Sequence, residues 1–573
     1  MIYILLIIMQ LIYPNQKIEY FTKVSTKNDP SCQYDQIFTN SIQPATHICL
    51  INCVFKNIGS LSQEYGMITL QNDDLLSFSN LIDNCTFQNC LSKYGSALII
   101  SNQPNSETRV TNCLFQDMKG STNGGSIFVN HSNIFLSRCT FYSNYIQNTN
   151  EECNGGAVFI TDTHCAVESC TFEDDHISFK NQVTYFGGAF NSQYSEINFS
   201  SCIFTKCYID SNVFSGDVCG GAVFLYKCAS IFNECLFKNN SIETKNSTCY
   251  GGALYTFNCN IILNLCIFRN NFVLTSIYRN IYELYGGGLY SIQTELEIND
   301  SEFDNNSITV SGSGFLESAL PYSGGAICYL NCNAKINSCF FNDNKIISTQ
   351  YYSLLYGGAI CLNGTGNSYL NNCIFNNNDE SIRDGFCYGC TIYSNAQTFF
   401  DQCNFSNNHG ESASGNIYGS IYISNNNINY ADFYRCSFED NFIYPISMAA
   451  CAYGGCLYFN SSKVFIRYSD FYNNSIQAGR MSANCYGGVL YMKGSICEIF
   501  NCNFNKNYVY SGPYKSGGGT ICMVLSSINV SNTIFNSSSV ICHHTQTYGG
   551  AMFIESSNFF FSYTTFNNCL LEH

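Results

Sequence analysis

The chain has 573 residues and a formal net charge of −16, and only 12% of its residues are charged, whereas 15% are aromatic, with no tryptophan. Such a chain is not intrinsically disordered, because disorder requires low hydrophobicity together with high charge. Strong helix formers are scarce while β-branched and aromatic residues abound, which excludes a mainly helical protein. The negative charge repels phosphate backbones, so we expect no nucleic-acid partner.

Residues 1–16, MIYILLIIMQLIYPNQ, are predicted to be a secretory signal peptide. The apolar run from Ile2 to Tyr13 has the length of a signal-peptide core and is too short to span a bilayer. No lysine or arginine precedes this run, and an uncleaved anchor is the alternative. No later stretch reaches the roughly 20 apolar residues of a spanning helix. We therefore expect no other transmembrane helix and an extracellular or cell-surface location.

Residues 17–45 are expected to form an N-terminal cap, and residues 46–573 a single repeat domain. One phrase of this domain, CIFRNN at 266–271, returns in 17 related copies, at a mean step of (566 − 55)/16, or about 32 residues. Cys stands two residues before the Phe in 13 copies, and Asn stands three residues after it in ten. The phenylalanines are Phe55, Phe87, Phe115, Phe141, Phe172, Phe204, Phe237, Phe268, Phe303, Phe341, Phe375, Phe405, Phe438, Phe471, Phe504, Phe535 and Phe566.

A second phrase alternates with the first in the same register. It reads GGAVF at 155–159 and 220–224, GGALY at 251–255 and GGAIC at 324–328. Glycine accepts a positive φ, so the paired glycines predict a turn that leads into a short strand. An interval of about 30 residues between such phrases is typical of a solenoid.

Each repeat predicts three short strands and three turns. The Gly pair precedes one strand, an apolar residue five positions before the Phe ends a second, and Cys-x-Phe forms a third. The Asn after the Phe is expected to close that strand in the left-handed conformation. One coil cannot bury its own apolar side, so coils must stack, with Phe on Phe and Cys on Cys. The pattern predicts an all-β fold, a parallel β-helix of about 16–17 coils.

The phrases G-G-A-[ILV] and F-x-x-N resemble the repeats of the polymorphic outer membrane protein family over about residues 50–570. This resemblance implies a right-handed, single-stranded parallel β-helix at a cell surface, with an adhesive role. Bacterial members of the family end in a membrane-inserting β-barrel, whereas this sequence ends in a coil, FNNCLLEH. This difference leaves open a secreted protein or a fragment of a larger surface protein.

The 35 cysteines allow three interpretations. For the Cys two residues before each Phe we favour a small buried slot, because Ser301, Ser469, Thr533 and Thr564 replace it in the other four copies. Disulfides are the alternative for the remaining cysteines, since a signal peptide implies an oxidising compartment. Metal binding is disfavoured because only eight histidines are scattered along the chain. We expect no metal site and no cofactor.

A carbohydrate-active enzyme, a polysaccharide lyase or hydrolase, is the alternative to a scaffold. Such sites need carboxylates clustered on neighbouring coils. Asp174 and Asp175 align with Lys206 and Cys207, Asp343 with Asn377, and Asp440 with Asn473, but no stack of acids emerges. These aspartates are interpreted as solvated turn residues, and no catalytic residue is assigned.

The segments that vary between repeats lie before the Gly pairs, and repeat proteins use such segments for binding. Residues 271–285 and 307–323 lengthen adjacent coils. They form a candidate interaction loop with Tyr278, Tyr282, Tyr285, Phe315 and Tyr322, because clustered exposed aromatic residues anchor partners. The alternative is that these residues only cover a hydrophobic sheet face. The sequence thus predicts an adhesin-like scaffold whose partner is an unknown surface protein or glycan.

Overall fold

The structure is a computed structural model, and it does not describe every residue. The predicted signal peptide and the first half of the expected cap lie outside the described residues. The described ranges are 32–38, 42–45, 48–64, 66–71, 79–148, 151–179, 184–211, 216–245, 247–276, 283–312, 320–424, 430–447, 450–478, 484–512, 515–542 and 547–572.

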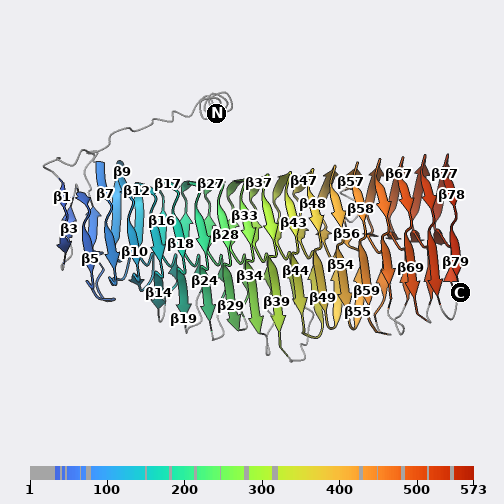
Figure 1. Ribbon diagram of the computed structural model, residues 1–573, viewed down its shortest axis with the longest axis horizontal. Helices are drawn as coiled ribbons and strands as arrows, with labels where there is room; N and C mark the ends of the chain where they lie inside the picture. The colour runs from blue at the N-terminus through green and yellow to red at the C-terminus, as the bar shows by residue number, and fades with distance from the viewer. Residues whose placement is uncertain are drawn as a thin grey trace, which may run out of the picture.

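The chain forms a long rod of stacked coils, with the chain running from one end to the other (Figure 1). Every strand pairs in parallel with its counterpart on the next coil, and the described residues contain no helix. One of the sheets has 15 strands, each from a different coil of about 32 residues. The predicted all-β parallel solenoid is therefore confirmed.

A representative coil has five strands, not the three that the sequence predicts. They are β35 (Leu284–Tyr285), β36 (Leu289–Ile292), β37 (Glu295–Asn299), β38 (Glu302–Asp304) and β39 (Ser307–Ser311). Strands like β36 and β37 form sheet A, those like β38 sheet B, those like β39 sheet C and those like β35 sheet D. No repeated phrase marks sheets C and D, so sequence analysis assigned them to variable segments.

The first described strands belong to the rod itself. β1 (Gln33–Tyr34), β2 (Ile37–Phe38) and β3 (Ile42–Ala45) pair in parallel with β4 (Cys49–Ile51), β5 (Val54–Lys56) and β6 (Ile68–Gln71). Part of the segment expected to cap the rod thus begins the first coil.

The predicted stack of phenylalanines forms the centre of the main core. It runs from Phe38 to Phe566, with ring centroids 4.5–5.1 Å apart and ring planes within 8° of parallel. These spacings are within the range of favourable offset stacking. Each fully buried Phe also contributes about 1.5–3 kcal/mol by leaving water.

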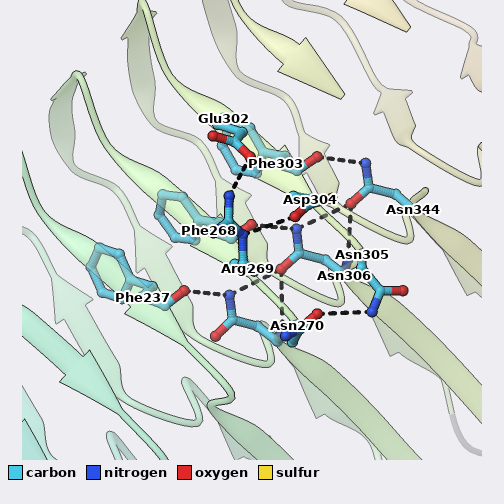
Figure 2. A network of polar contacts seen from close by, with 11 residues as sticks. Phe237, Phe268, Arg269, Asn270, Glu302, Phe303, Asp304, Asn305, Asn306 and Asn344 are labelled. Atoms are coloured by element: carbon cyan, nitrogen blue, oxygen red, sulfur yellow. Dashed lines mark hydrogen bonds and ion pairs between the residues drawn. The ribbon is translucent and has the colours of Figure 1, made fainter. Parts of the chain in front are cut away.

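A second ladder consists of the buried asparagines three residues after each Phe. Asn271 is representative: its Oδ1 accepts hydrogen bonds from the backbone N (3.0 Å) and Nδ2 (2.9 Å) of Asn240, and its Nδ2 donates to the carbonyl of Phe237 (2.9 Å) and to Oδ1 of Asn306 (3.0 Å). Figure 2 shows these bonds repeated through Asn306 to Asn344. Nine consecutive coils carry this ladder, from Asn240 to Asn507.

The left-handed residue expected at this Asn lies one position earlier. Asn270 has a φ of 55° and Asn305 a φ of 50°, whereas the ladder asparagines that follow them are fully buried. The prediction placed the turn at the wrong residue because both positions are often Asn. One Asn bends the chain, and the next one satisfies buried backbone groups.

The Gly pairs lie opposite this ladder and form a waist between two cores. A Cβ added at Gly287 would lie 2.6 Å from the carbonyl oxygen of Ser307, the first residue of β39. At Gly288, where other coils have Ala, it would lie 3.3 Å from Oδ1 of Asn306. Beyond the waist, sheets C and D enclose a second core of aliphatic side chains such as Ile242, Val273 and Ile308.

We call the cysteines two residues before each Phe the corner cysteines. Their contacts support the interpretation that they fill a small buried slot. Sγ of Cys266 donates to the carbonyl of Asn264 (3.4 Å), and its backbone N donates to Oγ of Ser301 on the next coil (3.0 Å). Ser301 makes the equivalent bond to the carbonyl of Asn299 (2.8 Å). Ser and Thr replace Cys there because a hydroxyl makes the same donor and acceptor contacts as a thiol.

We predict that Asn271→Ala destabilises the rod by about 3–9 kcal/mol. The substitution leaves two donors of Asn240 and the carbonyl of Phe237 buried without partners, at about 1–3 kcal/mol each. The matched control is Asn270→Gly, which preserves a positive φ and should change stability by less than about 1 kcal/mol. Urea denaturation followed by circular dichroism measures both variants. Equal losses in the two would contradict a special role for the buried ladder.

Candidate functional site

Two of the five residues of the predicted interaction loop are described, and neither projects from the rod. Tyr322, in β40 (Leu320–Ser323), is fully buried in the second core, so its expected exposure is wrong. Tyr322 is the register partner of the fully buried Leu284 on the preceding coil, so its ring also points inward. Tyr278, Tyr282 and Phe315 lie outside the described residues.

Tyr285 is half-buried in a row of tyrosines at the bend between sheets D and A. Its ring stacks on Tyr250 (5.7 Å between centroids, 2° between planes) and on Tyr290 (5.0 Å). Its hydroxyl donates to Oε2 of Glu283 (2.8 Å). This packing supports the alternative, in which the ring covers the sheet surface.

The variable segments begin and end at the same two sheets on successive coils. Each of them connects a strand of sheet C to the next strand of sheet D. Residues 277–283 connect β34 (Phe272–Ser276) to β35, and residues 312–319 connect β39 to β40, whereas only residues 383–384 separate β49 (Asp379–Ile382) from β50 (Gly385–Tyr388). Neighbouring coils therefore carry connections of very different length at the same edge.

A groove of about 620 Å³ lies beside the Asn turns on neighbouring coils, and we call it the charged groove. It is lined by Arg269, Asn270, Asp304, Asn305, Asp343, Lys345, Asn377, Asp379 and His409.

At one end of the charged groove Arg269 is held by two carboxylates. Its Nη2 contacts Oε1 of Glu302 at 2.7 Å and its Nε contacts Oδ2 of Asp304 at 2.8 Å (Figure 2). Both acids are on the following coil, so these ion pairs join neighbouring coils. The guanidinium is neutralised by its own neighbours, which makes it a structural group more than a ligand-binding one.

At the other end Lys345, Asp379 and His409 stack on three successive coils, each four residues after its Phe. Oδ1 of Asp379 lies 3.4 Å from Nε2 of His409, which is longer than an ordinary charge-assisted hydrogen bond. Burial raises the pKa of Asp379 to about 6, although His409 and Lys345 act in the opposite direction. A carboxyl of this kind can exchange a proton near neutral pH, which is the property of a general acid or base.

Sequence analysis missed this stack because it searched for columns of acids alone. A search for any titratable side chain at one offset would have found Lys345, Asp379 and His409. The predicted neighbours Asp343 and Asn377 do contact each other, and Nδ2 of Asn473 donates to Oδ1 of Asp440 at 2.6 Å.

A second groove of about 590 Å³ lies along sheet A. His164 contacts Glu196 there at 3.1 Å, and Nζ of Lys227 lies 5.3 Å from the centre of the Tyr194 ring. The His164 and Glu196 side chains are 73% and 70% exposed, so this groove has less shielding from water than the charged groove. Exposed pairs of this type contribute little binding energy.

Asp175 is fully buried, so its assignment to a solvated turn is wrong. It stands three residues after Phe172, at the position of the ladder asparagines in later coils, and its Oδ1 accepts from the backbone N and Nδ2 of Asn144, both at 2.8 Å. Its Oδ2 has no hydrogen-bond partner and stands where an asparagine would have its donating nitrogen. Burial therefore raises the pKa of Asp175 well above its ordinary value. Asp174, one residue earlier, has the left-handed φ of 59°.

Within the described ranges, no group of three or more His, Cys, Asp or Glu side chains is arranged to hold a metal ion. No helix among the described residues is long and apolar enough to cross a membrane. No protein-family model matches the chain, and no curated protein matches its sequence.

We predict that Asp175→Asn stabilises the rod by about 1–3 kcal/mol at pH 7, because an amide supplies the missing donor of the ladder. The pKa of Asp175 is raised in the folded state, so folding favours its protonated form. Its penalty is absent below the unfolded value near 3.8 and grows as the pH rises toward the folded value. Denaturation midpoints of variant and wild type should differ at pH 7 and converge near pH 3. A difference that does not depend on pH would contradict this assignment.

Proposed function

We propose that this protein is a secreted or cell-surface β-helix scaffold, adhesin-like, that binds a surface protein or glycan through the connections between sheets C and D. One observation carries the proposal: the interior is nearly invariant from coil to coil, while the connections between sheets C and D change in length and composition on most coils. Packing fixes the Phe, Asn and Gly positions, so those residues are not available for selectivity. The connections do not contribute to the ladders and can diversify without loss of the fold.

Two of the three longest connections, residues 277–283 and 312–319, lie on neighbouring coils. β34 pairs with β39 in register from Phe272↔Ser307 to Ser276↔Ser311, and β35 pairs with β40. The strands that flank residues 277–283 and 312–319 therefore lie on adjacent coils, about 4.8 Å apart. Two adjacent segments of this kind can act together as one binding surface.

The scaffold proposal predicts that replacing residues 312–319 with a two-residue turn abolishes binding to cells or glycan arrays. Thermal unfolding should be unchanged, because the deletion removes neither β39 nor the buried Tyr322. The matched control replaces residues 479–483, which connect sheets C and D elsewhere on the rod, and should retain binding. Binding that survives the first replacement would overturn the proposed site, and loss of the unfolding transition would assign the segment to stability.

The charged groove favours a second candidate, a carbohydrate-active enzyme. Asp379, with a pKa raised to about 6, stands beside His409 and near Asp343 on neighbouring coils. Glycoside hydrolysis uses a pair of carboxyl groups, one of which has a raised pKa. The scaffold proposal predicts that no reducing ends are released from neutral or acidic polysaccharides. Turnover that is lost in Asp379→Asn but kept in Asp440→Asn would replace the scaffold proposal with the enzyme.

A further inference from the structure

Twelve corner cysteines, each two residues before a ladder Phe, form two uninterrupted columns. Their thiols are at most 2% exposed. Ser301 separates the columns, and Ser469 ends the second. The first contains Cys53, Cys85, Cys113, Cys139, Cys170, Cys202, Cys235 and Cys266, and the second Cys339, Cys373, Cys403 and Cys436.

Within the first column, the backbone N–H of a cysteine donates to the sulfur of the cysteine on the next coil in several pairs. The N–H of Cys53 donates to Sγ of Cys85, that of Cys85 to Sγ of Cys113, and that of Cys139 to Sγ of Cys170, all at 3.4 Å. The strands that follow these residues pair in register, so their Cα atoms are separated by the coil spacing of about 4.8 Å. Disulfides join residues with Cα atoms about 4.4–6.8 Å apart.

The rod already contains one bridge of this geometry. Cys32 and Cys49 form a disulfide with a Cα–Cα distance of 4.5 Å. They precede Gln33 and Leu50, which are register partners on neighbouring coils. Coils stacked at this spacing can therefore be bridged by cysteines at equivalent positions.

We propose that the cysteines of the two columns are oxidised in pairs. Each pair forms one disulfide, which joins two neighbouring coils. Both columns have an even number of members, so only one pairing of neighbours leaves none unpaired. The six bridges are Cys53–Cys85, Cys113–Cys139, Cys170–Cys202, Cys235–Cys266, Cys339–Cys373 and Cys403–Cys436. Cys502 stands between Ser469 and Thr533 and keeps its thiol.

The co-reactant is a low-molecular-weight or protein disulfide. One cysteine thiolate attacks this disulfide, forms a mixed disulfide and releases one thiol. The thiolate of the neighbouring cysteine then attacks the mixed disulfide, forms the bridge between coils and releases the second thiol. Two cysteines are oxidised, one disulfide is reduced to two thiols, and the two cysteine protons pass to the departing thiolates.

The exchange takes place while a coil is at the end of the growing rod. In the finished rod the column cysteines are at most 2% exposed, so a disulfide in the solvent cannot reach their sulfurs. At the last coil the equivalent residue, Thr564, is only half-buried, whereas Thr533 one coil earlier is fully buried. Because solenoids fold by adding coils to neighbours, each pair is accessible before the next coil covers it.

The test refolds the full chain from urea and reductant in a mixture of oxidised and reduced glutathione. Remaining thiols are alkylated under denaturing conditions, and the bridges are mapped by mass spectrometry of peptides. We expect the six bridges, an alkylated Cys502, and a higher guanidinium midpoint than that of the chain refolded in reductant. A chain secreted by eukaryotic cells is mapped in the same way, so the result does not depend on refolding in vitro.

Two variants separate this pairing from random oxidation. Cys235→Ser should leave Cys266 as a thiol and keep the other five bridges, whereas Cys502→Ser should change none. Folded protein whose column cysteines are all alkylated, or bridges between other partners, would overturn the inference. The inference does not rest on the proposed function, because the test supplies its own oxidant and measures no binding.

Discussion

At the waist of the rod, the second glycine of each pair lies against the backbone that follows the buried Asn. The added Cβ would approach the carbonyl oxygen of Ser307 to 2.6 Å at Gly287, and that of Ser475 to 2.5 Å at Gly455. A Cβ at this distance would collide with the carbonyl oxygen, so glycine stands at this position in most coils. The close approach buries the Asn beside it, and a buried amide must find partners, which the neighbouring coils provide. The two repeated phrases share one register because they are the two sides of this contact.

One of the coils without the second glycine shows how the contact is accommodated. Cys390 replaces that glycine, and a Cβ at Gly410 on the same coil would meet its Sγ at 2.0 Å. Gly410 thus leaves the space that the thiol fills, where other coils have residues such as Ile443. Glu380 is the register partner of Gly410 on the preceding coil. It is fully buried, and both of its carboxyl oxygens lack hydrogen-bond partners. Burial raises the pKa of Glu380 well above the ordinary value. The second core therefore tolerates an unusual residue such as the buried Glu380. The waist accepts a side chain larger than glycine where a neighbouring residue, here Gly410, leaves room for it.

The fold could be predicted from the sequence wherever one residue type satisfies one packing requirement. Phe268 and its equivalents stack because only a large ring fills that position, and the Gly pairs mark the waist because only glycine fits. The role of Asn271 could not be predicted, because Asn serves both as a left-handed turn residue and as a buried hydrogen-bonding group, and only burial separates the two. Tyr322 was predicted to lie in an exposed loop for a related reason. An aromatic residue just before a Gly pair can belong to a strand or to the connection that precedes the strand, and its position in the repeat does not separate the two. The charged groove combines residues one, two and four positions after different Phe rungs, a relation that only the stacked coils make visible.

The division between interior and edge determines where this rod can acquire function. Each coil is stabilised by contacts with its two neighbours, so the removal of one Phe, Asn or Gly weakens two interfaces at once. A substitution in a connection between sheets C and D affects no ladder, which is why residues 277–283 and 312–319 can differ while β34 and β39 keep their register. The corner cysteines are intermediate between these cases. Their slot accepts a hydroxyl as well as a thiol, as Ser301 shows, so the hydrogen bonds of the slot do not require sulfur in runs of eight and four. What sulfur adds over oxygen is the capacity for a covalent bond between coils, and a column of neighbours is the arrangement in which that capacity can be used.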